Sequence, residues 1–181
     1  MTVIGHVGGY NRQKNQQMLM YILKAIEAKN PSKDFCLISV GRGHTQKDVE
    51  QLASKLGVDG KVRFLGQRTD VPKLLNAMDM FFLPSLFEGF PIVAIEAQTA
   101  GLPLVIADTI SKEVELTNLV HWLPIDKGAE VWAEKYYQIA HTKVNRVQYA
   151  PIVERKGFDA RHSAQILQDI YVKNILRNEN S

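Results

Sequence analysis

Short apolar runs, each followed by a turn and then by a helical segment, recur along this chain. The runs that read as strands are Val3–Val7, Phe35–Val40, Val62–Leu65, Met80–Leu83, Leu104–Ala107 and Val120–Leu123. Met80–Leu83 has no polar alternation, which is typical of a parallel strand covered on both faces. Strands that alternate with helices through short loops predict an α/β fold, a Rossmann-like doubly wound parallel sheet of about six strands.

The segments between these runs carry helix signals. Leu19, Ile22, Leu23 and Ile26 share one face of a helix that we expect from Asn15 to Lys29. The other expected helices are Thr45, as N-terminal cap, to Leu56; Asp70 to Met78; a single turn at Glu113–Leu116; Ala129–His141, with a further short helix between Thr142 and Phe158; and Asp159–Leu176. We therefore expect a single domain over residues 1–181, with 128–181 as its C-terminal helices.

The most informative stretch follows the strand Met80–Leu83. Glu88 and Gly89 form a turn, and Pro91 suits the first position of a helix that Gly101 would end. A strand, a glycine turn and an open helix N-terminus are typical of an anion site, most often for phosphate. Glu88 and Glu96 flank this site, so its ligand should carry phosphates in the middle and hydroxyls at both ends. A nucleotide sugar has that layout.

Each of these residues also has an ordinary interpretation. Glu88 could be a solvated loop acid, Glu96 a helix-surface residue and Lys14 a solvated lysine. Glu96 lies in a helix start that is otherwise almost wholly apolar. A charge buried there would need a partner, because burying it alone is very costly, and ribose hydroxyls would be suitable partners.

The sequence lacks the motifs of several other classes of protein. Gly5, Gly8 and Gly9 do not fit G-x-G-x-x-G, no Walker loop is present, and Ser85 is not in a G-x-S-x-G elbow. The histidines His6, His44, His121, His141 and His162 show no metal-ligand spacing. A net charge of +3 is too small to indicate nucleic acid. The single cysteine, the lack of a long apolar run and the start of the chain lead us to expect a reduced, soluble, cytoplasmic domain.

A resemblance to a known family rests on Glu88 and Glu96, which are spaced as Glu-x7-Glu. Leu83-Pro-Ser precedes this pattern and Gly101-Leu-Pro-Leu-Val follows it. With these flanks, the chain resembles the C-terminal, donor-binding half of retaining GT-B glycosyltransferases of family 4 (group 1). The sequence of these stretches is similar to that of bacterial enzymes of capsular and extracellular polysaccharide assembly, and the similarity covers nearly the whole chain.

The resemblance implies roles for individual residues. Glu88 would bind hydroxyls of the donor sugar, Glu96 would bind the ribose, and Lys14 would neutralise the diphosphate as it leaves. Glu88 and Lys14 would be the catalytic residues. The implied substrate-binding residues are Gly8, Gly9, Arg12, Lys14, Gly41, Gly66, Gln67, Arg68, Glu88, Gly89, Phe90, Pro91, Ile92, Val93 and Glu96.

The resemblance also implies partners. We expect a UDP- or GDP-linked sugar donor, no metal, no cofactor and no nucleic acid. An N-terminal acceptor domain would be the missing partner, and the domain alone would be inactive. Membrane contact, at the inner face of the plasma membrane, would come through the full-length protein. The alternatives are a non-catalytic nucleotide-sugar-binding remnant, a GT-B nucleotide-sugar epimerase and a relative of the glucan synthases.

The chain departs from the family pattern in two ways. Gly9 stands where an arginine usually pairs with the diphosphate, and Arg12 is the nearest arginine in sequence. Because a charge-assisted contact contributes roughly 1.5–3 kcal/mol, its loss should weaken donor binding by roughly one to two decades. The chain also begins at the first strand of the donor-binding half, so we expect a fragment, a natural half or a remnant.

Overall fold

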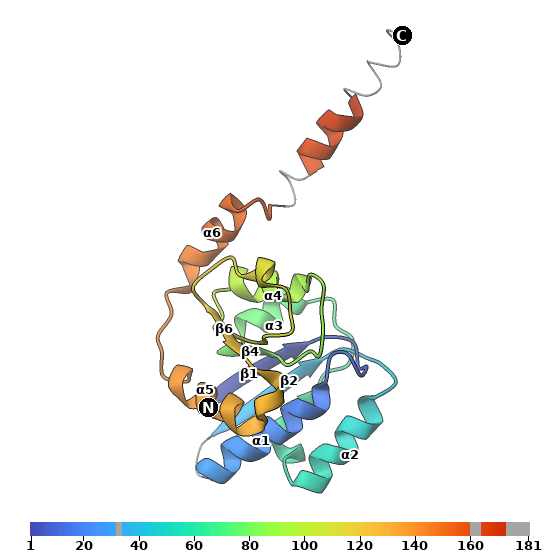
Figure 1. Ribbon diagram of the computed structural model, residues 1–181, viewed down its shortest axis with the longest axis vertical. Coiled ribbons are helices and arrows are strands. Elements are labelled where there is room, and N and C mark those ends of the chain that lie inside the picture. Colours follow the sequence, from blue (N-terminus) through green and yellow to red (C-terminus); the bar gives the residue numbers. More distant parts are fainter. Residues whose placement is uncertain (32–33, 160–163, 173–181) are drawn as a thin grey trace.

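The computed structural model describes residues 1–31, 34–159 and 164–172, and in it a parallel sheet lies between two layers of helices (Figure 1). The strands are β1 (Thr2–Val7), β2 (Phe35–Val40), β3 (Val62–Phe64), β4 (Met80–Leu83), β5 (Leu104–Ala107) and β6 (Val120–Leu123). Neighbouring strands all pair in parallel, in the order β3-β2-β1-β4-β5-β6. This is the Rossmann strand order, and it confirms the predicted doubly wound sheet.

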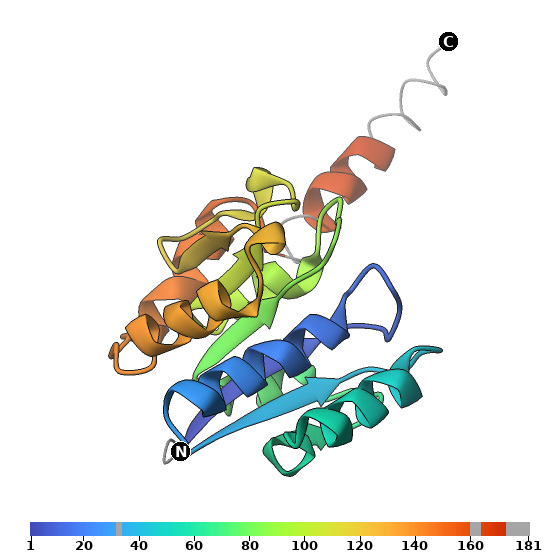
Figure 2. The same cartoon turned by 60° about the horizontal axis from the view of Figure 1, so that its bottom comes forward.

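Helices cover both faces of this sheet (Figures 1 and 2). They are α1 (Gln16–Lys29), α2 (Gln46–Leu56), α3 (Val71–Asn76), α4 (Ile92–Thr99), α5 (Ala129–Ile139) and α6 (Tyr149–Arg155). On one face α1 packs against both α2 and α5, and on the other α4 packs against α3 and α6. The single turn predicted at Glu113–Leu116 is a 3-10 turn at Lys112–Val114.

The core is centred on β4, whose four residues are all buried. Phe82 meets the ring of Trp132 from α5 edge to face, with the ring centroids 6.0 Å apart. Burying each such aromatic side chain contributes about 1.5–3 kcal/mol, and an aromatic pair adds about 1 kcal/mol. The strand that leads into the Glu88 turn is therefore fixed in the middle of the molecule.

Glycines end two helices as predicted, but two details at helix starts were wrong. Gly57 and Gly101 have φ of 72° and 68° and terminate α2 and α4. Pro91 is the N-cap of α4 rather than its first residue, because its ψ of 105° is still extended. Thr45 is the N-cap of α2, yet its hydroxyl makes no capping bond and has no hydrogen-bond partner among the described residues. Its ψ of 2° departs from the extended conformation in which a capping side chain folds back.

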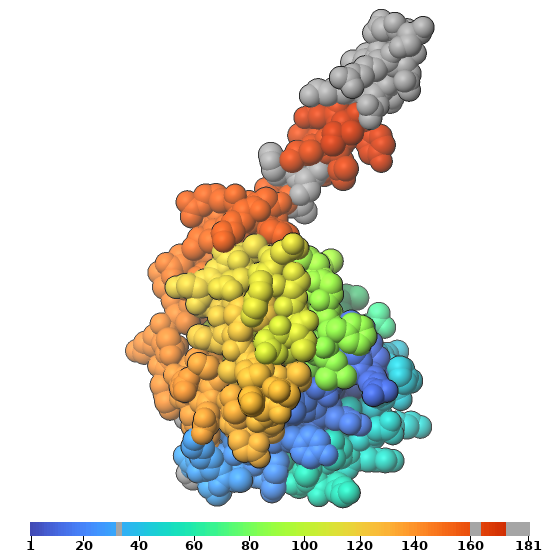
Figure 3. Space-filling view, viewed as in Figure 1, coloured from blue at the N-terminus to red at the C-terminus, as the bar shows by residue number. Residues whose placement is uncertain are grey.

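The C-terminal part of the described chain stands away from the sheet (Figures 1 and 3). Residues 164–172 form a helix with exposed apolar side chains, among them Ile166, Leu167, Ile170 and Tyr171. Of the helix predicted from Asp159 to Leu176, residues 160–163 and 173–176 lie outside the described residues. No helix of the described ranges is long and apolar enough to cross a membrane.

Candidate functional site

The strand order places a crevice at the carboxyl ends of β1 and β4. These strands are neighbours, but β1 leads into a helix on one face of the sheet and β4 into a helix on the other. Ligands of doubly wound sheets bind at such a switch point. Lys14 follows β1 and Glu88 follows β4, so the fold brings together two residues that are far apart in sequence.

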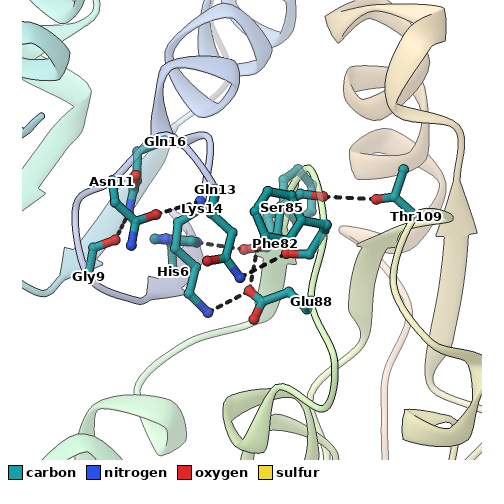
Figure 4. A network of polar contacts seen from close by, with 11 residues as sticks. His6, Gly9, Asn11, Gln13, Lys14, Gln16, Phe82, Ser85, Glu88 and Thr109 are labelled. Carbon is teal, nitrogen blue, oxygen red and sulfur yellow. Dashed lines mark hydrogen bonds and ion pairs between the residues drawn. The ribbon is translucent and has the colours of Figure 1, made fainter.

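Lys14 and Glu88 form an ion pair in this crevice (Figure 4). The Nζ of Lys14 lies 2.5 Å from Oε1 of Glu88, and the two side chains are only 17% and 9% exposed. Ser85 donates its hydroxyl to the same oxygen at 2.8 Å. Glu88 is therefore not a solvated loop acid, and Lys14 is not a solvated lysine. The second carboxylate oxygen, Oε2, accepts no hydrogen bond from the described residues and is available to a ligand.

The loop that carries Glu88 is held from both sides. The side chain of Gln13 donates to the carbonyl oxygen of Phe87 at 3.0 Å, and the hydroxyl of Thr109 donates to the carbonyl oxygen of Ser85 at 3.0 Å (Figure 4). Glu88 itself forms a parallel bridge with Ile110. The position of its carboxylate is thus fixed without a ligand.

His6 lies beneath this pair and is fully buried. Its Nδ1 is 3.0 Å from the carbonyl oxygen of Phe82, which can only accept, so Nδ1 carries the proton. Burial lowers the pKa of His6 from 6.5 to about 4, and the nearby Lys14 also lowers it. His6 is therefore neutral near pH 7. Its Nε2 is a buried acceptor without a partner among the described residues, and it lies close to Gly8.

The N-terminus of α4 is open. No side chain caps it, and its first turn contains no acid. The amides of Ile92 and Val93 have no acceptor among the described residues, whereas the amide of Ala94 bonds back to Pro91 at 3.0 Å. Two free amides at the positive end of a helix dipole favour an anion.

Glu96 lies farther along α4 and is exposed, which corrects the expectation that it is buried among apolar residues. Ala94 and Ala97 of α4 are buried, while Glu96 lines a cavity of about 750 Å³. Phe90, Ile92 and Phe158 form part of its wall. The carboxylate makes no hydrogen bond or ion pair with a described residue, so it is open to solvent and to a ligand.

The glycine loops meet on the other side of the crevice. Gly8, Gly9, Gly41, Gln67 and Arg68 line a cavity of about 350 Å³. Gly66 joins them because the amide of Gly41 donates to its carbonyl oxygen at 2.8 Å.

Arg12 is the predicted binding residue that is set apart. It lines a separate cavity of about 360 Å³ with Asn15 and Leu86. The sequence put Arg12 forward only because it stands close to Gly9, and closeness along a turning loop does not fix the direction of a side chain.

Sequence reasoning missed the residues that hold Glu88 in place, namely Gln13, Ser85 and Thr109. Gln13 and Thr109 make their contacts between loops, with partners 74 and 24 positions away, whereas Ser85 contacts Glu88 within the same loop. The only signal was that Ser85 belongs to the Leu83-Pro-Ser stretch that carries the resemblance. It also missed His6, because a histidine in a strand looks the same whether or not it lies beneath a site.

Comparison with known proteins identifies the family. Residues 1–141 match the model of the family described as glycosyl transferases group 1. EpsF of Bacillus subtilis, which is named as a glycosyltransferase, is 31% identical over 93% of this chain and 44% of its own. An Escherichia coli galactosyltransferase, named for the donor UDP-Gal and a GlcNAc-diphosphoundecaprenol acceptor, is 34% identical over 56% of this chain and 27% of its own.

Solved structures agree with this match. HepE of Anabaena, crystallised with UDP, is 25% identical and superposes with a TM-score of 0.72 over 94% of this chain and 48% of its own. The chain spans less than half the length of these relatives. Its sheet is the Rossmann-like half of a GT-B fold, as predicted. The chain belongs to the group 1 glycosyl transferases.

Proposed function

We propose that this chain is the donor-binding domain of a retaining, metal-independent glycosyltransferase that builds a surface polysaccharide. The observation that carries the proposal is the Lys14–Glu88 pair, which lies in the crevice between the glycine loops and the open N-terminus of α4. Support also comes from the relatives, since HepE was solved with UDP and the E. coli enzyme is named for a UDP-sugar and a lipid-linked sugar.

The diphosphate of the donor would lie against the free amides of Ile92 and Val93. Lys14 has three donors on its ammonium, so it can contact a phosphate oxygen while it still contacts Glu88. Negative charge grows on the diphosphate as the bond to the sugar breaks, and a cation already in place stabilises that change. Lys14 and the helix terminus would supply positive charge that a metal supplies in other transferases.

The two carboxylates would bind the two ends of the donor. Oε2 of Glu88 would accept a hydrogen bond from a sugar hydroxyl, while Oε1 keeps Lys14 and Ser85 in place. Glu96 would accept hydrogen bonds from ribose hydroxyls at the mouth of its apolar cavity. The acceptor would be bound by a second domain, so the chain by itself would bind the donor without transferring the sugar.

Calorimetric or NMR titration of the 181-residue chain with UDP and GDP tests the proposal. We expect one of the two to bind, with affinity that is unchanged by EDTA and that is lost in Glu96→Ala. Thr142→Ala, in the loop after α5, is the control variant and should bind as the parent does. Absence of binding of either nucleotide at millimolar concentration would contradict the proposal, and sugar transfer by the chain alone would contradict the need for a second domain.

A further inference from the structure

Three cations border the crevice on the side of the glycine loops, and two of them are already neutralised. Lys14 is paired with Glu88. Arg68 donates two hydrogen bonds to the carboxylate of Asp70, at 2.9 and 2.8 Å. Arg42, in the loop after β2, is exposed and has no acidic partner among the described residues. The uncompensated positive charge on this side therefore belongs to Arg42.

The backbone displays Arg42 toward the crevice. The loop after β2 packs directly on the loop after β1, so that a Cβ on Gly41 would lie 2.0 Å from the carbonyl oxygen of Gly8. A Cβ on Gly43 would lie equally close to that of Tyr10, and the amide of Tyr10 donates to the carbonyl oxygen of Arg42 at 3.0 Å. The loops after β1 and β2 leave no room for a side chain at Gly41 or Gly43, whereas Arg42, between them, carries its side chain out of this contact.

The side chain of Arg42 borders the cavity of about 350 Å³ that the glycine loops enclose. Its Nε lies 3.7 Å from the place where a Cβ on Gly66 would be, so the side chain extends over the loop that follows β3. Gly9 lines the same cavity and offers no side chain of its own. A planar guanidinium on the rim of a pocket of this size suits bidentate contact with phosphate oxygens.

We propose that Arg42 binds the diphosphate of the donor and supplies the cation that position 9 lacks. The inference rests on the proposed function, because it needs a nucleotide in the crevice. A nucleoside diphosphate carries two to three negative charges. Lys14 is already balanced by Glu88, and a helix terminus contributes only about half a charge, so a further cation increases the attraction for the diphosphate. Arg42 is placed to provide it.

Titration of the chain and its Arg42→Ala variant with UDP, UMP and uridine, or with the guanosine series if GDP is the nucleotide bound, tests this inference. We expect Arg42→Ala to weaken binding of the diphosphate roughly 10- to 100-fold and to leave binding of the nucleoside unchanged, since the nucleoside has no phosphate. Arg42→Lys should lose less. Arg63→Ala removes the same charge from an exposed arginine of the edge strand β3 and should leave the affinities for all three ligands unchanged.

Two results would overturn the inference. Affinity for the diphosphate within twofold of the parent would show that Arg42 does not contact it. An equal loss for nucleoside and diphosphate would show that the guanidinium stacks on the base instead. Failure of the parent chain to bind any nucleotide would remove the proposed function as well, so the two failures are distinguishable.

A second variant, Gly9→Arg combined with Arg42→Ala, tests whether side chains at positions 9 and 42 bind the same phosphates. Gly9 does not have a positive φ, and a Cβ there would meet nothing closer than 3.6 Å, so the site accepts a side chain. We expect Gly9→Arg to restore the diphosphate affinity of Arg42→Ala to within about threefold of the parent. A folded double variant, verified by thermal unfolding, that shows no recovery would contradict the shared role.

Discussion

The two acids of the Glu-x7-Glu pattern sit in opposite surroundings. Glu88 is 9% exposed and is held by Lys14 and Ser85, on a loop that is fixed from both sides. Glu96 is exposed, borders an apolar cavity and contacts no charged group of the described chain. The first acid is part of the structure of the crevice, whereas the second is available for a ligand.

This difference separates stability from binding. A partly buried, hydrogen-bonded charge is costly to leave unpaired, so substitutions around Glu88 should lower the free energy of unfolding. An exposed acid without partners contributes little to folding, so changes at Glu96 should be felt only when a ligand is present. Four predictions test this division.

Lys14→Met should cause the largest loss. It leaves Glu88 with the hydroxyl of Ser85 but without a cation, and we expect the free energy of unfolding to fall by about 3 kcal/mol. Chemical denaturation measures this. Lys24→Met breaks a pair in which Lys24 is 49% exposed and should cost less than about 0.5 kcal/mol. Equal small losses in both variants would mean that the Glu88 region is not structurally distinct.

Acid should weaken the same region through His6. Its folded pKa of about 4 lies below the unfolded value of 6.5, so the unfolded chain binds the proton first as pH falls. The stability that depends on neutral His6 is therefore fully present only above pH 6.5. We expect the free energy of unfolding to fall by about 2 kcal/mol between pH 7 and pH 4.5. His6→Asn can keep a donor to Phe82 and should lose less over the same range. An unchanged pH profile in this variant would contradict the assignment.

The sequence predicted much of this arrangement, for reasons that are local. Apolar runs located the strands and two glycines located helix ends, because burial on both faces and positive φ leave a direct mark on residue type. The Lys14–Glu88 pair, the burial of His6 and the exposure of Arg42 depend on which loops meet across the sheet. The sequence does not separate Arg12 from Arg42, whereas the fold places them at different cavities.

Glu96→Gln should have a smaller effect, and only on binding. The loss of a charge-assisted bond to ribose hydroxyls should weaken UDP or GDP binding about tenfold, while stability stays within about 0.5 kcal/mol of the parent. Titration and denaturation of the same preparation measure both. Glu130→Gln on α5 serves as the control. If Glu96→Gln lowered the free energy of unfolding but left the affinity for the nucleotide unchanged, Glu96 would have the structural role that we assign to Glu88.

Phe158→Ala should have the smallest effect and shows whether the two regions act independently. Phe158 stacks on Phe90 with centroids 5.6 Å apart, and its loss should cost about 1 kcal/mol of stability. Phe87→Ala, an exposed ring without a ring partner among the described residues, should cost less.

Phe90 follows Glu88 closely in the loop, so the stack connects the loop of Glu88 to the wall of the cavity of Glu96. Lys14→Met and Phe158→Ala share no contact, and their costs should add to within about 0.5 kcal/mol if the loop is rigid. A coupling larger than about 1 kcal/mol would mean that the loop transmits strain from the cavity of Glu96 to the ion pair. Occupancy of the proposed ribose site would then affect Glu88, and the two acids would act as one unit.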